Sequence, residues 1–437
     1  MTTIDIRRID LAGLDPRDRA QLTRRRAVPD QAIREGAAAI VAEVRSGGDD
    51  AVRRANERYG GGLSSGELAV APEIITAGRS RLDRTTVDAL QAAIDAIEAC
   101  HRPQLPRNHR VQPTPGVLVE RRWSPLRRVA VYVPGGRAPY PSSLLMGVVP
   151  ARIAGVSEIV VATPAGSDGI IGDAILAAAE MAGATEVYAI GGAQAVAALA
   201  YGTETITPVD KIVGPGNAWV TAAKLAVFGD VAIDLPAGPS EALVLTDGSA
   251  TPRLVAVDMI CQAEHGPDSP IVLVTTRPDT ITTILAEIAR FLPMLEREQI
   301  VAKALSDHGL IVTALDIETA IDFANDYAPE HLTIHTSDSA AHADQIHTAG
   351  SVFVGHWAPE SAGDYATGAN HILPTGGQAR AHGPLGVADF GSWLQVQHIS
   401  RAGLEALRPT IAALSAAEGL TAHRLAAEIR FDEESRP

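Results

Sequence analysis

Cysteine and aromatic residues are scarce in this sequence. Its two cysteines, Cys100 and Cys261, exclude a disulfide-rich scaffold and a zinc cluster built from cysteines. So few cysteines are typical of a protein from a reducing compartment. Aromatic residues make up 4% of the chain, which leaves few platforms for stacking the bases of single-stranded nucleic acid.

The chain also lacks an excess of positive charge and long apolar runs. Its 37 Lys and Arg face 52 Asp and Glu, and a net charge of −15 repels phosphate backbones. The first residues alternate apolar and charged side chains, without the apolar core of a signal peptide. The longest nearly apolar stretches, 144–156 and 188–201, are too short to span a membrane. We therefore predict a cytoplasmic protein that binds neither nucleic acid nor membrane.

What is present is the composition of an ordinary globular protein. Hydrophobic residues make up 46% of the 437-residue chain and charged residues 20%, and the length suggests two or three domains. Residues 1–125 have mostly helical periodicity, at 30–61 and 85–102, and 103–115 are expected to form a connector because they are rich in Pro and polar residues. We assign this helical N-terminal segment to the first α/β domain.

Residues 126–241 repeat a unit of buried strand, glycine turn and helix. Expected strands occupy 129–133, 158–162, 186–190 and 211–213, and turns such as Pro134-Gly135-Gly136 follow them. This alternation predicts a parallel, doubly wound sheet that binds ligands at the carboxyl ends of its strands. The dinucleotide fingerprint G-x-G-x-x-G is absent from the sequence.

Residues 242–386 repeat the rhythm and predict a second α/β domain. Its expected strands are 242–246, 271–275, 310–313, 333–334 and 351–355. A Gly-, Pro- and His-rich loop at 355–386 follows, and a tail at 387–437 ends in an expected helix at 410–430, just after Pro409. The predicted fold is therefore α/β, with two Rossmann-like domains on parallel sheets, a helical N-terminal segment and a C-terminal tail.

The adjacent residues Glu330 and His331 are the first candidates for catalysis. Pro329 should stop the preceding helix, which puts the pair at a helix-to-strand junction. Histidine can move protons near neutral pH, and a neighbouring carboxylate can activate water. The alternative is an ordinary Glu-His pair at a surface helix end.

Possible metal ligands occur in two segments. Gln262 and His265 are three residues apart and share one helix face, which can begin a metal site or simply form a polar helix end. Asp364 and His371 fall in the long loop. Their side chains are of types that bind metals, and the alternative is that they are solvated at the surface.

Other candidates are weaker when taken alone. Gln194 and Asn217 follow glycine turns. Their side chains could contact a ligand or could equally cap the helices that begin there. Glu418 and His423 are five residues apart on an expected helix and do not face one way, so by themselves they indicate nothing.

Taken together, these segments resemble the histidinol dehydrogenase family. The matching blocks run in order from about residue 30 to the end and include KIVGPGNAWV at 211–220, QAEHGPDSP at 262–270, YAPEHL at 327–332, GDYATGANHILPTGG at 363–377 and LTAHRLAAEIR at 420–430. The segments 378–384 and 391–400 depart from the family's common pattern without removing a motif residue. The resemblance implies oxidation of L-histidinol, through the aldehyde, to L-histidine with two NAD.

The resemblance also implies roles for single residues. One zinc per subunit would be held by Gln262, His265, Asp364 and His423. His331 would be the general base, and Glu330 would activate water for the second oxidation. Further residues would contact the substrate (Ser240, Glu418, and again Gln262, His265, His331, Asp364 and His423) or NAD (Tyr132, Gln194 and Asn217), and His371 would lie near the site without an assigned role.

The family resemblance implies a homodimer with shared active sites. The C-terminal tail would be exchanged, so that Glu418 and His423 reach the partner's site; the residues themselves equally allow a tail that folds back on its own subunit. Alternative functions are an NAD-dependent dehydrogenase of another small polyol, such as a sulfonated propanediol, a zinc hydrolase without NAD dependence, and a protein that binds its ligand without turnover.

Overall fold

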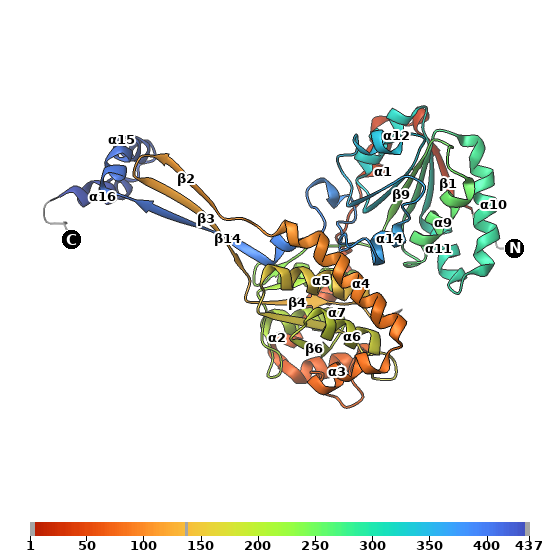
Figure 1. Ribbon diagram of the computed structural model, residues 1–437, viewed down its shortest axis with the longest axis horizontal. Helices are drawn as coiled ribbons and strands as arrows, with labels where there is room; N and C mark the ends of the chain where they lie inside the picture. Colours follow the sequence, from red (N-terminus) through yellow and green to blue (C-terminus); the bar gives the residue numbers. More distant parts are fainter. Residues whose placement is uncertain (1–4, 136–138, 433–437) are drawn as a thin grey trace. The chain divides into compact units, whose positions relative to one another are not determined.

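The chain folds into two compact units. The computed structural model describes residues 5–135 and 139–432. We call the first unit, Met1–Gln104 with Leu126–Phe390, the main unit, and the second, Leu105–Pro125 with Gly391–Pro437, the tail unit (Figure 1). Residues 105–125, which we had assigned to the N-terminal segment, thus group with the tail. Gly136 of the expected first glycine turn lies outside the described residues.

The first sheet of the main unit is parallel, in the order β6-β5-β4-β7-β8. The expected alternation of strand and helix is confirmed, while the short strand β8 was not predicted. The elements are β4 (Arg128–Tyr132), α5 (Pro141–Ala154), β5 (Glu158–Thr163), α6 (Asp173–Ala182), β6 (Glu186–Ala189), α7 (Gly192–Tyr201), β7 (Lys211–Val213), α8 (Ala218–Val227) and β8 (Ala232–Ile233).

The N-terminal helices cover this sheet. α2 (Gln31–Tyr59) packs on α7 and α8, α3 (Pro72–Arg81) on α6, and α4 (Arg84–His101) on α5. Buried alanines and valines of α2 share one core with α7 and α8, because small side chains let the helices approach closely.

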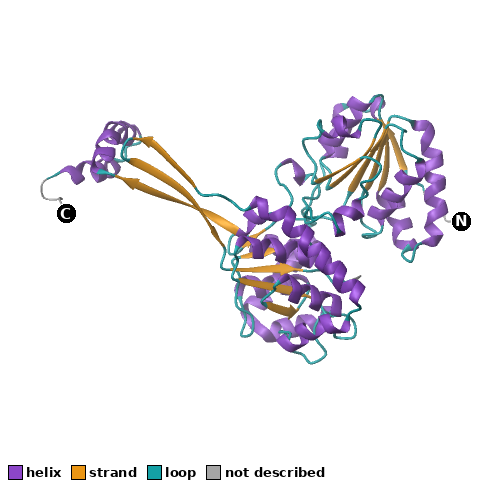
Figure 2. Ribbon diagram, viewed as in Figure 1, coloured by secondary structure: helices purple, strands orange, loops and turns teal. Residues whose placement is uncertain are grey.

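The second sheet is also parallel, in the order β1-β11-β10-β9-β12-β13, and its central strands β10, β9 and β12 are buried on both faces. One face packs against α9, α10 and α11 and the other against α12 (Figures 1 and 2). The elements are β1 (Arg7–Asp10), α1 (Pro16–Thr23), β9 (Ala242–Thr246), α9 (Pro252–Ala263), β10 (Ile271–Thr275), α10 (Ile281–Phe291), α11 (Glu298–His308), β11 (Gly309–Thr313), α12 (Ile317–Tyr327), β12 (His331–His335), α13 (Ser339–Ala343), β13 (Ser351–Val354) and α14 (Glu360–Tyr365). β1, α11 and α14 were not predicted. α14 lies within residues 355–386, which we expected to be a loop, and α13 is shorter than the helix expected at 338–349.

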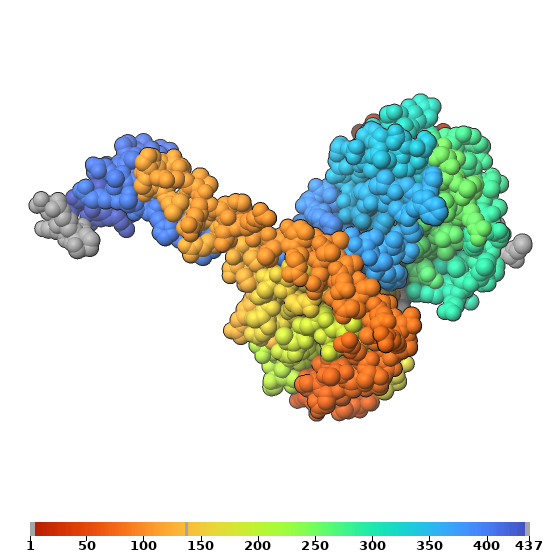
Figure 3. All heavy atoms as spheres, in the orientation of Figure 1, coloured from red at the N-terminus to blue at the C-terminus, as the bar shows by residue number. Residues whose placement is uncertain are grey.

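The tail unit is an antiparallel sheet with two helices. β3 (Val117–Pro125) pairs with both β2 (His109–Thr114) and β14 (Gly391–Ile399), and α15 (Arg401–Ala417) and α16 (Thr421–Glu428) follow. Figure 3 shows residues near 110 and the C-terminal residues forming this one unit.

Two expectations about the tail unit were wrong. The segment 103–115 is not a simple connector, because β2 finds its hydrogen-bonding partner in β3. The last long helix begins at Arg401, before Pro409, because the Ser400 side chain caps it by accepting from the Gly403 N–H. No helix of the described residues is long and apolar enough to cross a membrane.

Candidate active site

A cavity of about 1310 Å³ in the main unit is lined by residues from both sheets. The first sheet contributes turns at the carboxyl ends of its strands, such as Pro134, Gly192 and Gly216. The second sheet contributes the opposite, amino ends of its strands, with Ser240 just before β9 and Glu330 just before β12. The glycine turns and the Glu-His pair therefore line one cavity.

The turn before β12 positions Glu330 and His331. α12 ends at Tyr327, and Ala328 adopts the left-handed conformation with φ 51°, the only non-glycine residue of the described chain with positive φ. Pro329 disfavours continuation of the helix through the residue before it. β12 then begins at His331, so the predicted helix-to-strand junction is confirmed.

Both residues of the pair are buried. The Glu330 carboxylate accepts hydrogen bonds from Ser240 Oγ at 2.7 Å and from the Glu241 N–H at 2.9 Å. His331 Nδ1 lies 3.7 Å from Glu330 Oε2, and neither ring nitrogen of His331 has a hydrogen-bond partner among the described residues. Buried polar atoms normally have partners, so these free nitrogens mark a ring that can take up a proton from a ligand.

Burial raises the pKa of Glu330 to about 7, while the charge of His331 and the Ser240 hydrogen bond act in the opposite direction. A carboxyl group with such a pKa exchanges protons near neutral pH, as a general base requires.

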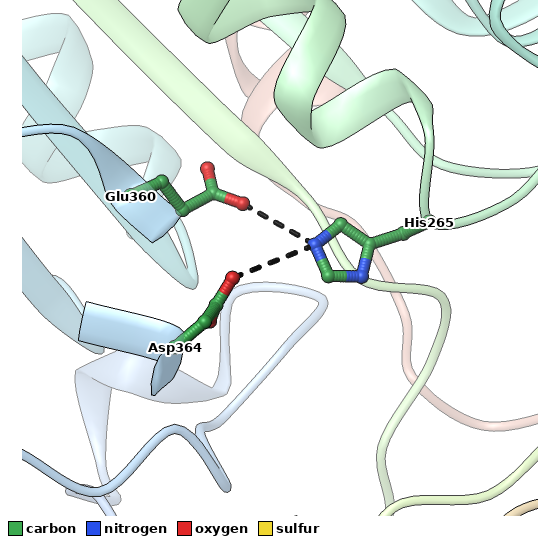
Figure 4. A group of neighbouring side chains, drawn as sticks. All are labelled: His265, Glu360 and Asp364. Atoms are coloured by element: carbon green, nitrogen blue, oxygen red, sulfur yellow. Dashed lines mark ion pairs between the residues drawn. The ribbon is translucent and has the colours of Figure 1, made fainter. Parts of the chain in front are cut away.

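His265, Glu360 and Asp364 form a group that could hold a metal ion (Figure 4). His265 Nε2 lies 3.4 Å from Glu360 Oε1 and 4.0 Å from Asp364 Oδ2, and the potential ligand atoms all lie within 4.8 Å of one another. Burial lowers the pKa of His265, but the hydrogen bond and charge of Glu360 raise it to about 9. Burial and the charge of Glu360 raise the pKa of Asp364.

Buried polar atoms around this group fit a bound cation. Gln262 is fully buried three residues before His265 on α9, and neither its side-chain oxygen nor its nitrogen has a described partner. Among the described residues, Glu360 Oε1 has only the rings of His265 and His331 within ion-pair distance. Oxygen and imidazole donors of this kind are suitable zinc ligands.

Glu360 was missed in the sequence. It begins α14 and lies four residues before Asp364, so both carboxylates share one helix face. The four-residue spacing of Glu360 and Asp364, directly after Pro359, is the sequence signal that could have indicated Glu360.

His371 contacts the backbone of Asp364. Its Nδ1 is 3.0 Å from the Asp364 carbonyl oxygen, which can only accept, so Nδ1 carries the proton and Nε2 accepts from Ser143 Oγ at 3.1 Å. Burial lowers the pKa of His371 to about 4, so the ring is neutral at physiological pH.

The three residues expected at NAD line the cavity beside the glycine turns. The Tyr132 hydroxyl accepts from the Gly192 N–H at 3.1 Å, and Gln194 Nε2 lies 3.4 Å from Asn56 Oδ1. Asn217 Oδ1 accepts from the first N–H groups of α8 and is thus a helix cap as well.

A buried Lys224–Asp234 ion pair, which was not predicted from the sequence, holds the turn at Gly214 that follows β7. The Gly214 N–H donates to Asp234 Oδ2 at 2.7 Å, and Lys224 Nζ donates to the Gly214 carbonyl at 2.8 Å. Gly214 has φ 115°, and a Cβ there would lie 2.1 Å from the Tyr132 carbonyl oxygen, so the position requires glycine.

The expected site residue Gln262 is fully buried and does not line the cavity. Glu418 and His423 are the other expected site residues that the cavity lacks. Both lie in the tail unit, at the end of α15 and on α16, and both are exposed. All described residues that line the cavity belong to the main unit.

These features define an α/β enzyme whose cavity joins glycine turns to a metal-competent group of a partly exposed histidine and two buried carboxylates. The family model "Histidinol dehydrogenase" matches residues 23–431, and the chain belongs to this family. It is therefore an oxidoreductase of histidine biosynthesis.

Named relatives agree over nearly the full length. Histidinol dehydrogenase of Methanothermobacter thermautotrophicus is 46% identical over 384 residues, covering 88% of this chain and 90% of the relative. That of Halobacterium salinarum is 45% identical, covering 97% and 99%. The crystal structure of histidinol dehydrogenase from Elizabethkingia anophelis has a TM-score of 0.91 at 34% identity and covers 99% of both chains.

Proposed function

We propose that the chain oxidises L-histidinol through L-histidinaldehyde to L-histidine, with zinc bound and two NAD reduced. The observation that carries this proposal is the buried acidic cluster. Glu330, Glu360 and Asp364 are all buried, and among the described residues their ion-pair partners are His265, His331 and His371, with no Lys or Arg. Buried carboxylates require compensating charge, which a divalent cation and an ammonium-bearing substrate supply.

This charge separates the candidate substrates. Histidinol carries an amine and an imidazole, which suit a carboxylate-rich site and a zinc ion. A sulfonated propanediol carries a negative group, which the same carboxylates would repel.

Zinc would be held by Gln262, His265 and Asp364, with His423 of a second copy. When bound it would orient the imidazole and amine of the substrate. Glu360, beside His265, would add negative charge next to the ion.

His331 would act as the base in both oxidations. It would take the hydroxyl proton as the carbon-bound hydride leaves for the nicotinamide of NAD, which breaks one C–H bond and forms the carbonyl. Its buried ring nitrogens, which have no hydrogen-bond partner among the described residues, support this role.

Glu330 would serve the second oxidation. Its carboxylate would take a proton from water as the water oxygen adds to the aldehyde carbon, and would return that proton to the former aldehyde oxygen, giving the hydrate. Loss of a second hydride and a proton from the hydrate then gives the carboxylic acid. The pKa of about 7 allows Glu330 to accept this proton near neutral pH.

NAD would bind at the carboxyl ends of β4, β6 and β7, against Tyr132, Gln194 and Asn217. Backbone N–H groups at glycine turns and helix N-termini suit the pyrophosphate of a dinucleotide.

We further propose that the enzyme is a homodimer whose tail units complete the partner's active sites with Glu418 and His423. Both residues are exposed and outside the cavity of their own main unit. α15 and α16 also leave large apolar side chains exposed: Leu414, Leu420, Leu425 and Ile429. Such a patch on a small unit is typical of an interface.

Counting NADH formed per histidinol consumed tests the main proposal, with and without a chelator. Two NADH per histidinol are expected, and activity should fall when zinc is removed. Absence of turnover at saturating NAD would refute it. NADH formed from a sulfonated diol alone would favour the alternative dehydrogenase, and turnover without NAD would favour a hydrolase.

A further inference from the structure

Arg25 is a largely buried cation that the mechanism above does not use. It follows α1, and its side chain is 16% exposed. Its guanidinium forms an ion pair with Glu241, donates to the carbonyl oxygens of Tyr327 and Ala328, and stacks 3.4 Å from the centre of the Tyr327 ring. One side chain thus binds the end of α12 and the start of β9.

The end of α12 needs such a partner. The carbonyls of Tyr327 and Ala328 lie at the helix end, where backbone oxygens lack helical partners and the dipole is negative. Ala328 also adopts a left-handed conformation that residues with a Cβ rarely take. The Arg25 guanidinium donates hydrogen bonds to both carbonyl oxygens and therefore stabilises this turn.

Glu241 connects Arg25 to the catalytic pair. Its backbone N–H donates to the Glu330 carboxylate at 2.9 Å, and its carbonyl accepts from the His331 N–H at 3.2 Å. Its own carboxylate is 3% exposed and is held by Arg25 and by the Gly376 N–H at 3.1 Å. The backbone that aims Glu330 is therefore anchored through the side chain of Glu241.

We propose that Arg25 and Glu241 are positioning residues that hold the Ala328–Glu330 turn and aim the Glu330 carboxylate. Arg25 binds the residues that precede Glu330 in the chain, Tyr327 and Ala328. The backbone of Glu241 binds Glu330 and His331 themselves. The inference rests on the proposed role of Glu330 as the group that activates water.

Arg25→Met is the first test, made in the full-length, zinc-loaded enzyme. We expect kcat for oxidation of histidinaldehyde to fall about 10- to 100-fold, because misplacing a catalytic group costs rate steeply. kcat for the alcohol step should fall less than about threefold, and KM for histidinol should change less than about twofold, because Arg25 touches no proposed substrate ligand.

Two further variants separate positioning from stability. Arg25→Met with Glu241→Gln removes both buried charges, so we expect the melting temperature to recover but not the aldehyde rate. Ala328→Gly added to Arg25→Met should recover part of the aldehyde rate, because glycine adopts the left-handed turn without a clamp.

Arg380→Met is the matched control. Arg380 also donates to backbone oxygens beside this turn, those of Thr23 and Asp326, but it does not contact Glu241. We expect a lower melting temperature with both half-reactions reduced by less than about threefold.

Equal losses in both half-reactions of Arg25→Met, or full recovery of the aldehyde rate in the double charge variant, would overturn the inference. A crystal structure of Arg25→Met tests the placement without any substrate. We expect the Glu330 carboxylate to leave the Glu241 N–H. An unchanged turn would overturn the inference, whereas failure of the wild type to oxidise histidinol would refute only the proposed function.

Discussion

Replacing Glu330 with glutamine keeps the shape of a buried side chain and removes its basicity. A positioned general base contributes about 10²- to 10⁴-fold to a rate. We therefore expect Glu330→Gln to slow oxidation of histidinaldehyde about 10²- to 10³-fold. Oxidation of histidinol to the aldehyde should slow less than about tenfold, because His331 is the proposed acceptor of that proton.

The same substitution should change stability with a defined sign. The pKa of Glu330 rises on folding from 4.5 to about 7 because of burial, a difference worth roughly 3 kcal/mol. The stability that this group contributes in protonated form is complete below about pH 4.5 and is lost as the pH rises through about 7. At pH 8 the metal-free Glu330→Gln protein should therefore be about 1–3 kcal/mol more stable than the wild type.

Two assays test the expected rates and stability of the Glu330→Gln variant. Stopped-flow NADH formation from histidinol and from histidinaldehyde separates the two half-reactions, and urea unfolding at pH 5 and pH 8 gives the stability difference. Glu264→Gln is the control, since Glu264 lines the same cavity at the end of α9 but is only partly buried. Equal slowing of both half-reactions, or a less stable variant at pH 8, would refute the assigned role and burial energetics of Glu330.

Three other outcomes follow from the site. Ser143→Ala leaves Nε2 of buried His371 without a donor, and should lower the free energy of unfolding by about 1–3 kcal/mol in urea denaturation. Glu360→Gln should weaken zinc retention about 10- to 100-fold, measured as metal content after dialysis against graded chelator. Lys224→Met leaves Asp234 buried without its cation, and should cost about 3–5 kcal/mol of stability and raise KM for NAD.

Each of these variants has a neighbour for comparison. Ser142→Ala, on the same helix as Ser143, should leave the unfolding free energy unchanged, because no hydrogen bond to His371 is lost. Glu264→Gln should retain zinc like the wild type. Lys303→Met removes only an exposed ion pair with Asp307 and should cost less than about 1 kcal/mol. A loss in any neighbour as large as in its partner would contradict the assigned contact.

Local sequence patterns specified most of the regular elements. The runs Lys211–Val213, Ala242–Thr246 and Ile271–Thr275 were predicted with the bounds that the structure has. Strands of this kind are buried on both faces, so they read as short apolar runs between turn residues. Pro329 likewise marked the junction that carries Glu330 and His331, because its effect acts on the residue directly before it.

Pairing between distant segments was not predictable in this way. β1 joins β11 some 300 positions away, and β3, which also pairs with β2, joins β14 across most of the chain. Neither the short polar strand β1 nor the Pro-containing strand β2 has a clear local signal. Such strands form because a neighbouring edge supplies hydrogen-bonding partners, which a local pattern does not contain.

By itself, then, the sequence determined the α/β class, the position of the Glu330–His331 pair and the family. The tertiary structure alone decided that Glu360 lies against His265 and that Arg25 lies against Glu241, 216 positions apart. It also decided that the amino end of β12, which carries Glu330 and His331, lines the same cavity as the glycine turns at the carboxyl ends of the first sheet's strands. The physical reason is that burial and charge pairing depend on which surfaces meet, whereas periodicity and turn chemistry act within a few residues.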